Sequence, residues 1–416
     1  MVQAKRQRVA FLLDNLAGGG AERVVLTLAR ELSQRGYDVD LLVCERRGEL
    51  SDQVSGRVHL IELQAASRIV GFAACLLGCR DSAGALLTLL LRSRKLPKSL
   101  RYLPAVRAYL QSSAPAVLIA ALPKANVCAV LANRLAGSRA RVFVGVHIAL
   151  SMQILQARRK GKGHLQYLMP LLRYCYHLAD GVIAVSAGVR QDAIELLGLD
   201  ATRVKVVYNP IEVTPCDRAL CDADVHPWFS ESSVPVVVGV GRLVEQKNFP
   251  LLMRAFALLL ARQPARLIIV GGDQSGDQLA ERRALEALAQ ELGIERYADL
   301  VGYQQSPQEY LHRANLFVLS SAFEGFGNVL VEALLAGCPI VSTDCPSGPR
   351  EILRDGEFGA LVSLGSEYAL AQAIQKALQV EHDKEALRQR GEEFSVEKAV
   401  QGYQRVLFEQ GVGTIS

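Results

Sequence analysis

The chain has 416 residues, of which 50% are hydrophobic, and a formal net charge of +5. A chain of this length forms two or three domains with large cores, and its hydrophobic content argues against intrinsic disorder. The small charge, without the aromatic and basic repeats of single-strand binders, argues against nucleic-acid binding. Nine cysteines without a Cys-x-x-Cys pair or zinc-like spacing indicate reduced thiols in a cytoplasmic protein.

The start of the chain and its apolar stretches bear on export and on membrane spans. Residues 1–8 are basic but lead directly into an apolar strand-like run, so we do not expect a signal peptide. No stretch reaches the roughly 18 uncharged apolar residues that cross a bilayer. We therefore expect a cytoplasmic protein that is soluble or peripheral to a membrane.

The first elements form a β-loop-α-β unit. Residues 8–13 are typical of a buried strand, and the loop Gly18-Gly19-Gly20 follows them. Apolar residues then recur on one helical face through residues 24–32, and residues 39–44 predict the next strand. The glycines stand where a nucleotide fold has them, although they match neither the dinucleotide fingerprint nor a P-loop. The alternative is a tight turn that only packs helix on strand.

Residues 65–113 alternate leucine-rich pieces with arginines and lysines and contain one acid, Asp81. Basic amphipathic helices of this kind can lie on a membrane interface. Ordinary surface helices with solvated arginines explain the pattern equally well, and both interpretations stay open.

Further strands are predicted at residues 116–122, 141–147, 181–185 and 204–208, separated by helical patterns. Strands and helices that alternate in this way predict a parallel, doubly wound sheet. His147 ends one of these strands, where ligands bind in such sheets, so it is a candidate site residue; a structural role is the alternative.

A second α/β pattern follows a proline-rich and acidic stretch at residues 213–235. It begins with a strand at 236–240 and a loop that carries Arg242 and Lys247. From residue 349 to the end of the chain we expect only helices. The predicted domains are residues 1–208 and 209–394, followed by a C-terminal helical segment at 395–416 that packs back toward the first domain.

The richest candidate site lies at residues 314–337. An apolar strand, a loop with two glycines and the start of a helix follow one another, and a helix start favours an anion such as phosphate. Glu324 and Glu332 frame this helix start. Carboxylates repel phosphate but accept hydrogen bonds from hydroxyl groups, so the pattern predicts hydroxyls on both sides of a phosphate. A nucleotide sugar has this arrangement.

Four stretches of the sequence form a recognisable set. They are Gly18-Gly19-Gly20-Ala21-Glu22-Arg23-Val24, Gly241-Arg242-Leu243 with Lys247-Asn248, Glu324-x7-Glu332, and Pro346-Ser347-Gly348-Pro349-Arg350-Glu351. Together they resemble the retaining nucleotide-sugar glycosyltransferases of family 4, over residues 8 to 405. These glycosyltransferases have the GT-B architecture, an α/β fold of two tandem Rossmann-like domains that face each other across a cleft.

The resemblance implies that residues 1–208 form the acceptor side and that residues 209–394 bind the nucleotide sugar. It also implies roles for individual residues. Arg242 and Lys247 would neutralise the donor diphosphate, and Glu332 would bind the ribose. Glu324 would hold hydroxyls of the transferred hexose, which His147 would also contact. The remaining donor contacts would come from the glycine loop of the first domain and from backbone amides at the helix start: Gly19, Gly20, Phe326, Gly327 and Asn328.

The resemblance also implies the reaction. No carboxylate is predicted on the far face of the sugar. The resemblance implies instead a same-face attack, in which the departing phosphate oxygen would help to take the acceptor proton without a metal or cofactor. We expect a UDP-sugar donor, in preference to GDP-sugar, and transfer of a hexose or N-acetylhexosamine to a lipid-linked acceptor in polysaccharide or lipopolysaccharide biosynthesis, at the cytoplasmic membrane face. The alternatives are a non-hydrolysing sugar-nucleotide epimerase and a transfer-inactive nucleotide-sugar-binding subunit.

Overall fold

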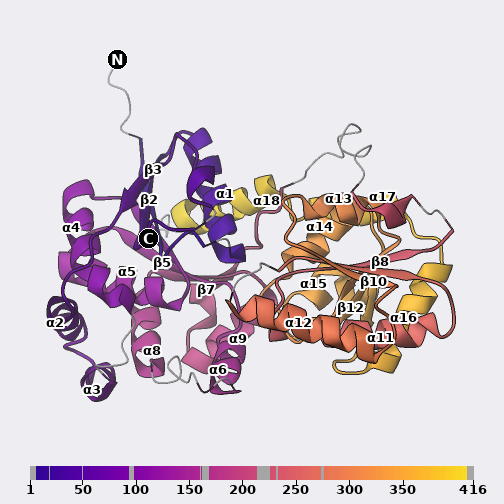
Figure 1. Cartoon of the computed structure of the whole chain (residues 1–416). Helices are drawn as coiled ribbons and strands as arrows, with labels where there is room; N and C mark the ends of the chain where they lie inside the picture. Colours follow the sequence, from indigo (N-terminus) through magenta and orange to yellow (C-terminus); the bar gives the residue numbers. More distant parts are fainter. Residues whose placement is uncertain are drawn as a thin grey trace. The chain divides into compact units, whose positions relative to one another are not determined.

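The structure, a computed structural model, describes residues 6–17, 19–48, 50–92, 98–159, 161, 168–212, 225–230, 233–272 and 276–409 (Figure 1). The chain divides into two compact units. Unit 1 comprises Met1–Pro210 and Glu397–Ser416, and unit 2 comprises Ile211–Val396. Gly18, residues 93–97 of the basic region and most of the stretch 213–235 lie outside the described residues.

The described residues of unit 1 form a seven-stranded parallel sheet in the order β3-β2-β1-β4-β5-β6-β7. Its strands are β1 (Arg8–Leu13), β2 (Asp38–Val43), β3 (His59–Glu62), β4 (Val117–Ala121), β5 (Arg141–Val146), β6 (Gly181–Ala184) and β7 (Val204–Val206). The strand order reverses between β1 and β4, which pair directly. In doubly wound sheets the carboxyl ends of strands at such a switch point are where ligands bind.

Helices connect and cover this sheet. They are α1 (Gly20–Gln34), α2 (Arg68–Gly78), α3 (Ala83–Arg92), α4 (Leu103–Ser113), α5 (Pro123–Ala136), α6 (Leu150–Arg159), α8 (Met169–Leu178) and α9 (Ala187–Leu197), with the short turn η3 (Lys98–Tyr102) before α4. Helix α1 buries Val24, Val25, Leu28, Ala29 and Leu32 on one face, as the spacing predicts. None of the described helices is long and apolar enough to cross a membrane.

The C-terminal segment of the chain returns to unit 1. Helix α18 (Val396–Gln404) is followed by a π-turn at Arg405–Glu409. Arg35 forms an ion pair with Glu397, and Tyr37 stacks on Phe408 with 5.1 Å between ring centroids. Unit 1 is therefore assembled from both ends of the chain.

The described residues of unit 2 form a six-stranded parallel sheet in the order β10-β9-β8-β11-β12-β13. Its strands are β8 (Val236–Val240), β9 (Arg266–Val270), β10 (Ala298–Gly302), β11 (Leu316–Leu319), β12 (Ile340–Thr343) and β13 (Ala360–Val362). The helices are α11 (Phe249–Leu260), α12 (Gly276–Glu291), α13 (Pro307–Arg313), α14 (Asn328–Ala336), α15 (Pro349–Ile352), α16 (Glu367–Gln379) and α17 (Lys384–Glu392).

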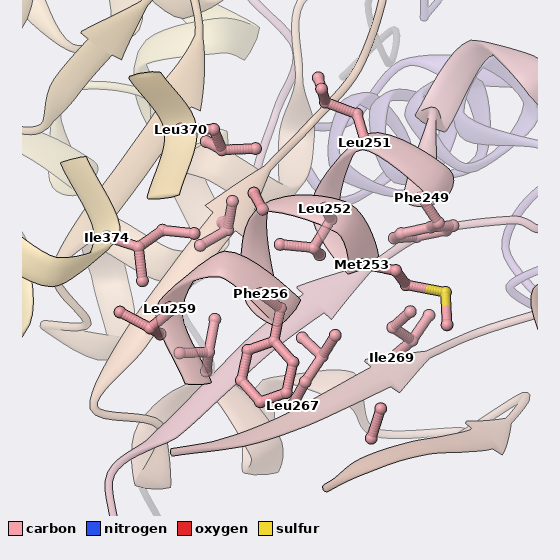
Figure 2. Packing of buried hydrophobic residues seen from close by; sticks show 14 of the residues in the cluster. Phe249, Leu251, Leu252, Met253, Phe256, Leu259, Leu267, Ile269, Leu370 and Ile374 are labelled. Carbon is pink, nitrogen blue, oxygen red and sulfur yellow. The ribbon is translucent and has the colours of Figure 1, made fainter. Parts of the chain in front are cut away.

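The core of unit 2 forms where α11 and α16 pack on the sheet. Figure 2 shows Phe256 of α11 beside Leu267 of β9, with Leu370 and Ile374 of α16 on the other side of α11. All four side chains are fully buried. Burying one such side chain contributes about 1.5–3 kcal/mol to the stability of the fold. The cluster therefore fixes the positions of the strands whose loops carry the predicted site residues of unit 2.

Two parallel α/β sheets confirm the predicted fold class, and two short strands were not predicted. Strand β3 has four residues and β13 has three, and each pairs with one neighbour at an edge of its sheet. The expectation of helices alone after residue 349 is therefore wrong at Ala360–Val362, because a three-residue strand is too short to show periodicity.

Candidate functional site

The loop between β11 and α14 is built as the sequence predicts, with strand, glycine turn and helix start in succession. Gly327 precedes α14 with φ of 97°, a left-handed conformation that favours glycine. Its carbonyl accepts a hydrogen bond from the backbone N–H of Leu330 at 2.8 Å. Phe323 and Phe326 are buried, so the loop is anchored in the unit and its backbone is held in place.

Glu324 is buried, with 6% of the residue exposed. Its Oε1 accepts hydrogen bonds from Lys247 Nζ at 2.7 Å and from Ser321 Oγ at 2.6 Å. Its backbone N–H donates to the carbonyl of Pro346 at 3.2 Å. The two residues that were predicted separately, Glu324 and Lys247, thus form one buried ion pair supported by a serine.

Lys247 is positioned by contacts between two loops. It ends the short turn η6 (Glu245–Lys247) after β8, and its carbonyl accepts a hydrogen bond from Ser320 Oγ at 2.8 Å. Gln246 accepts from the backbone N–H of Ala322 at 2.8 Å and donates its side-chain amide to the carbonyl of Phe323 at 3.0 Å. Because these bonds join the β8 and β11 loops, the ion pair is fixed by both of them.

The absence of a side chain at Gly241 leaves room for the side chain of Lys247. A Cβ atom at Gly241 would lie 2.9 Å from Lys247 Cε. A second close approach joins the β8 and β9 ends, where a Cβ at Gly271 would lie 2.2 Å from the carbonyl oxygen of Gly241. The glycine of the Gly241-Arg242-Leu243 motif is therefore explained by packing around the lysine.

Arg242 differs from Lys247 in its surroundings. Its side chain is exposed, and within the described part of the chain its guanidinium has neither an ion-pair nor a hydrogen-bond partner. The two cations predicted to act as a pair are thus in different states: Lys247 is bound to Glu324, and Arg242 is available to a ligand.

Helix α14 presents Asn328 and Glu332 together. They are four residues apart, on one face of the helix, and both are partly exposed. The neighbouring positions of the helix are buried: Val329, Leu330, Val331, Ala333, Leu334 and Ala336. The second glutamate of the Glu324-x7-Glu332 motif is therefore accessible, one turn inside the helix from its start.

The fourth motif supports the glycine loop from behind. Gly348 has φ of 99°, and a Cβ atom there would lie 1.8 Å from the carbonyl oxygen of Phe326. Thr343 Oγ1 donates to the carbonyl of Ser321 at 2.7 Å. Cys345 stands between Thr343 and Gly348 in the sequence. Its burial, and to a smaller extent the charge of Glu324, raise the pKa of its thiol to about 12, so the thiol stays protonated at neutral pH.

His147 follows β5 at the carboxyl edge of the sheet in unit 1 and is partly buried. Its Nδ1 is buried without a hydrogen-bond partner in the described part of the chain, and burial lowers the pKa of the imidazole to about 4. The ring is therefore neutral at physiological pH and carries an unsatisfied polar atom.

Sequence reasoning missed Asp14, which directly follows β1. Its Oδ1 is buried without a hydrogen-bond partner in the described residues. Burial raises the pKa of this carboxyl group, while the charge of Lys124 lowers it. The signal was present in the sequence, because an acid at the end of the first strand of a doubly wound fold lies at the ligand-binding edge.

Lys124 lies in the first turn of α5, directly after an unusual connection from β4. Leu122, two residues before it, has φ of 77° and ψ of 145°, a sparsely populated conformation for a residue with a side chain. Such strain occurs at functional sites. Asp14, Lys124 and His147 follow β1, β4 and β5, which are consecutive strands of the sheet, so all three stand at its carboxyl edge; we call them the polar cluster of unit 1.

In the glycine loop of unit 1, Gly19 precedes α1 and Gly20 is its first residue. A Cβ atom at Gly19 would lie 2.3 Å from Glu22 Oε2, so the glycine accommodates the glutamate of its own motif. No group of three or more His, Cys, Asp or Glu side chains able to hold a metal ion occurs among the described residues.

Two family models match successive parts of the chain. The model described as Glycosyltransferase Family 4 matches residues 18–214, and the model described as Glycosyl transferases group 1 matches residues 224–394. The first match ends four residues after Pro210, where the N-terminal segment of unit 1 ends, and the second match lies within unit 2.

Named relatives of the chain are glycosyltransferases as well. The N-acetylgalactosamine-N,N'-diacetylbacillosaminyl-diphospho-undecaprenol 4-alpha-N-acetylgalactosaminyltransferase of Campylobacter jejuni is 28% identical, over 90% of this chain and 90% of its own. The lipopolysaccharide core biosynthesis glycosyltransferase LpsE of Rhizobium meliloti is 33% identical over 47% of this chain and 54% of its own. Among solved structures, HepE of Anabaena in complex with UDP-glucose has a TM-score of 0.73 at 20% identity, covering 97% of this chain and 100% of that chain.

Two parallel α/β units of this kind define a GT-B protein, and the solved neighbours share this fold. The domain matches and the named relatives identify the chain as a glycosyltransferase, with homologues in lipid-linked and lipopolysaccharide glycan biosynthesis. The glycosyltransferase and GT-B parts of the prediction from sequence are thus confirmed.

Proposed function

We propose that this glycosyltransferase moves a hexose or an N-acetylhexosamine from a UDP-sugar to a lipid-linked glycan, with retention of the anomeric configuration. The observation that carries the proposal is the buried contact between Lys247 Nζ and Glu324 Oε1 beside the glycine-capped start of α14. It is supported by the Campylobacter relative, whose name gives a diphospho-undecaprenol acceptor and an N-acetylgalactosaminyl group.

On the donor side, Glu324 binds hydroxyls of the sugar. Both hydrogen bonds described for its carboxylate go to Oε1, which leaves Oε2 for a ligand. Lys247 fixes the carboxylate and keeps further N–H donors for the diphosphate, since an ammonium group has three. Arg242, exposed and unpaired among the described residues, supplies the main cation.

The remaining donor contacts follow from the geometry of α14. The backbone amides of Phe326, Gly327 and Asn328 meet the phosphate at the positive end of the helix, and Glu332 accepts hydrogen bonds from the ribose. A leaving nucleoside diphosphate gains negative charge in the transition state. Fixed cations and amides therefore stabilise the transition state more than the bound donor.

The polar cluster of unit 1 binds hydroxyl groups, Asp14 those of the acceptor and His147 those of the donor hexose. Asp14 and His147 each have a buried polar atom without a described partner, and a ligand hydroxyl satisfies both kinds of atom. The neutral imidazole of His147 contacts the donor hexose, and Gly19 and Gly20 allow close approach of the backbone to phosphate or acceptor. The departing phosphate oxygen takes the acceptor proton, and no metal or cofactor takes part.

The test is a donor panel. Purified protein is incubated with UDP- and GDP-linked glucose, galactose and their N-acetylhexosamine forms, and slow hydrolysis to nucleoside diphosphate is measured with and without EDTA. We expect release of UDP from one or two UDP-sugars, unaffected by EDTA. Interconversion of UDP-sugars without UDP release would instead identify an epimerase. Donor binding without turnover, also in the presence of lipid-linked acceptors, would identify an inactive binding subunit.

We further propose that the enzyme works at the cytoplasmic face of a membrane, because a lipid-linked acceptor is confined there. The basic region 65–113 is the part of the chain suited to an anionic surface. Anomeric analysis of the product by NMR would test retention: an α-linked product from an α-linked donor supports it, and a β-linked product contradicts it.

A further inference from the structure

Helix α2 packs with its small residues inward and its large apolar residues outward. Gly71, Cys75 and Gly78 are its buried positions, whereas Ile69 is 81% exposed and Leu77 is 61% exposed. The inward glycines are required by close packing, because a Cβ at Gly71 would lie 3.0 Å from Arg101 Cα and one at Gly78 would lie 3.2 Å from Leu131 Cδ2. The large apolar side chains of α2, of the kind that a helix in a globular protein normally buries, therefore face solvent.

Helix α3 repeats this arrangement. Ala85 is fully buried, while Leu87, Leu90 and Leu91 are 56%, 58% and 69% exposed. Leu87 and Leu91 are four residues apart and lie on one face of the helix. Among the described residues, the five most exposed large hydrophobic side chains of the chain all lie in α2 and α3. This concentration separates the two helices from a surface with scattered apolar residues.

The two helices touch each other and form an outer layer of unit 1 (Figure 1). Helix α2 packs on α4 and α5, and α3 packs on α8. Neither helix covers the sheet directly, because α5 contacts its strands instead. The exposed faces of α2 and α3, defined by Ile69, Val70, Leu77, Leu87, Leu90 and Leu91, form the surface that we call the apolar ledge.

The charges around the apolar ledge indicate what covers it. Arg68 begins α2, Arg80 follows it, and Lys98 lies in η3; all three are exposed. The single acid of the region, Asp81, is in ion pairs with Arg134 and with Arg80 (3.5 Å), so it neutralises only part of the positive charge. A second copy of the chain would bring like charges together at this surface, whereas a membrane with anionic lipids complements it.

The helix lengths fit a surface that lies in the interface. Helices α2 and α3 have 11 and 10 residues, roughly half of what a bilayer span requires. We propose that the apolar ledge inserts into the headgroup region of a membrane that contains anionic lipids, with Arg68, Arg80 and Lys98 among the headgroups. The biological purpose of this insertion rests on the proposed lipid-linked acceptor. The apolar ledge itself is observed independently of the reaction.

The insertion can be followed by fluorescence, because Trp228 is the single tryptophan of the chain and lies in unit 2. Full-length L91W is mixed with vesicles of phosphatidylcholine containing phosphatidylglycerol. We expect a blue shift of the emission on mixing, which persists at high salt because insertion is apolar. The matched control, L364W, replaces an exposed leucine of unit 2 (47% exposed) and is expected to show no shift.

Co-sedimentation with the same vesicles gives the strength of binding. The double variant Leu77→Ser with Leu91→Ser is expected to bind at least tenfold more weakly than the wild-type chain, and Leu364→Ser with Val380→Ser to bind as the wild type does. Vesicle binding that is equal in all three proteins, or lost entirely at high salt, overturns insertion. Sedimentation velocity tests for a second copy of the chain on the same surface. If the wild type is a dimer and the variant Leu77→Ser with Leu91→Ser is a monomer, insertion is overturned and the apolar ledge is a dimer interface.

Donor hydrolysis without vesicles separates this proposal from the proposed function. The ledge variants are expected to hydrolyse UDP-sugar at the wild-type rate, because none of the substituted residues belongs to the candidate site. If the wild-type protein binds vesicles but does not turn over the donor, the proposed function is contradicted and membrane insertion of the apolar ledge is supported. If it turns over the donor but does not bind vesicles, the proposed function is supported and insertion is contradicted.

Discussion

Lys247 and Glu324 are 77 positions apart in the sequence, and Lys247 Nζ lies 2.7 Å from Glu324 Oε1. Their side chains are 16% and 8% exposed. A buried ion pair of this kind contributes little net stability, but removal of one partner strands the other charge in a poorly solvated place. Positions suited to binding a substrate are therefore also positions on which local stability depends.

Single substitutions of this pair are expected to impair both activity and stability. Lys247→Met leaves the Glu324 carboxylate unpaired and is expected to lower the free energy of unfolding by about 3–5 kcal/mol. The double variant Lys247→Met with Glu324→Gln removes both charges and is expected to recover most of that loss without recovering activity. Urea unfolding and donor hydrolysis measure the two effects. A double variant as unstable as the single one would contradict the pairing.

Substitution of Arg242 separates binding from stability. The side chain is exposed and makes no described contact, so Arg242→Ala is expected to change the free energy of unfolding by less than about 0.5 kcal/mol. Loss of a cation at the diphosphate is expected to reduce kcat/KM for the donor at least tenfold. Arg254→Ala, another exposed arginine of unit 2, serves as the control. Unchanged donor kinetics in Arg242→Ala would remove this residue from the site.

The turn that carries Gly348 is expected to tolerate no side chain. Gly348→Ala puts a Cβ atom against the Phe326 carbonyl, where the space is 1.8 Å, so the glycine loop must move. Gly365→Ala is the matched control: Gly365 also has a positive φ, of 77°, but open space around it. We expect a cost of about 1 kcal/mol for the control from backbone strain alone and a clearly larger cost, with loss of donor binding, for Gly348→Ala. Thermal unfolding and donor titration measure both.

His147 makes the stability of unit 1 depend on pH. Its pKa falls from 6.5 to about 4 on folding, so between those values the unfolded chain binds more protons, and stability falls as pH decreases. The full effect of a shift of this size is about 3 kcal/mol. His147→Gln removes it: we expect the loss of stability between pH 7 and pH 4 to be smaller in the variant. Urea unfolding across this range tests the prediction, and parallel curves would contradict it.

Asp14 is expected to show a conflict between stability and function. Burial disfavours its charged form, so Asp14→Asn, which removes the charge at nearly constant shape, should leave the free energy of unfolding unchanged or raise it by about 1 kcal/mol. Transfer to the acceptor should weaken, while donor hydrolysis stays at the wild-type level. Equal loss of hydrolysis and transfer would show that Asp14 does not act on the acceptor alone.

The sequence was sufficient for the architecture because buried parallel strands are continuous apolar runs that local patterns reveal. The long central strands, such as β1 and β5, were predicted within one or two residues. Edge strands β3 and β13 were not, since four and three residues are too few for a pattern. The helix start at Gly327 was predicted because glycine and the apolar spacing after it are local signals.

What only the tertiary structure decided is which side chains meet and which face outward. The sequence placed Lys247 and Glu324 in one site but not in contact, because nothing local joins residues from different strand loops. It marked residues 65–113 as apolar and basic, yet their composition is the same whether the leucines point in or out. Close packing of the backbone at Gly71 and Gly78 turned the large side chains of α2 to the surface, and packing of that kind depends on partners that are distant in the sequence.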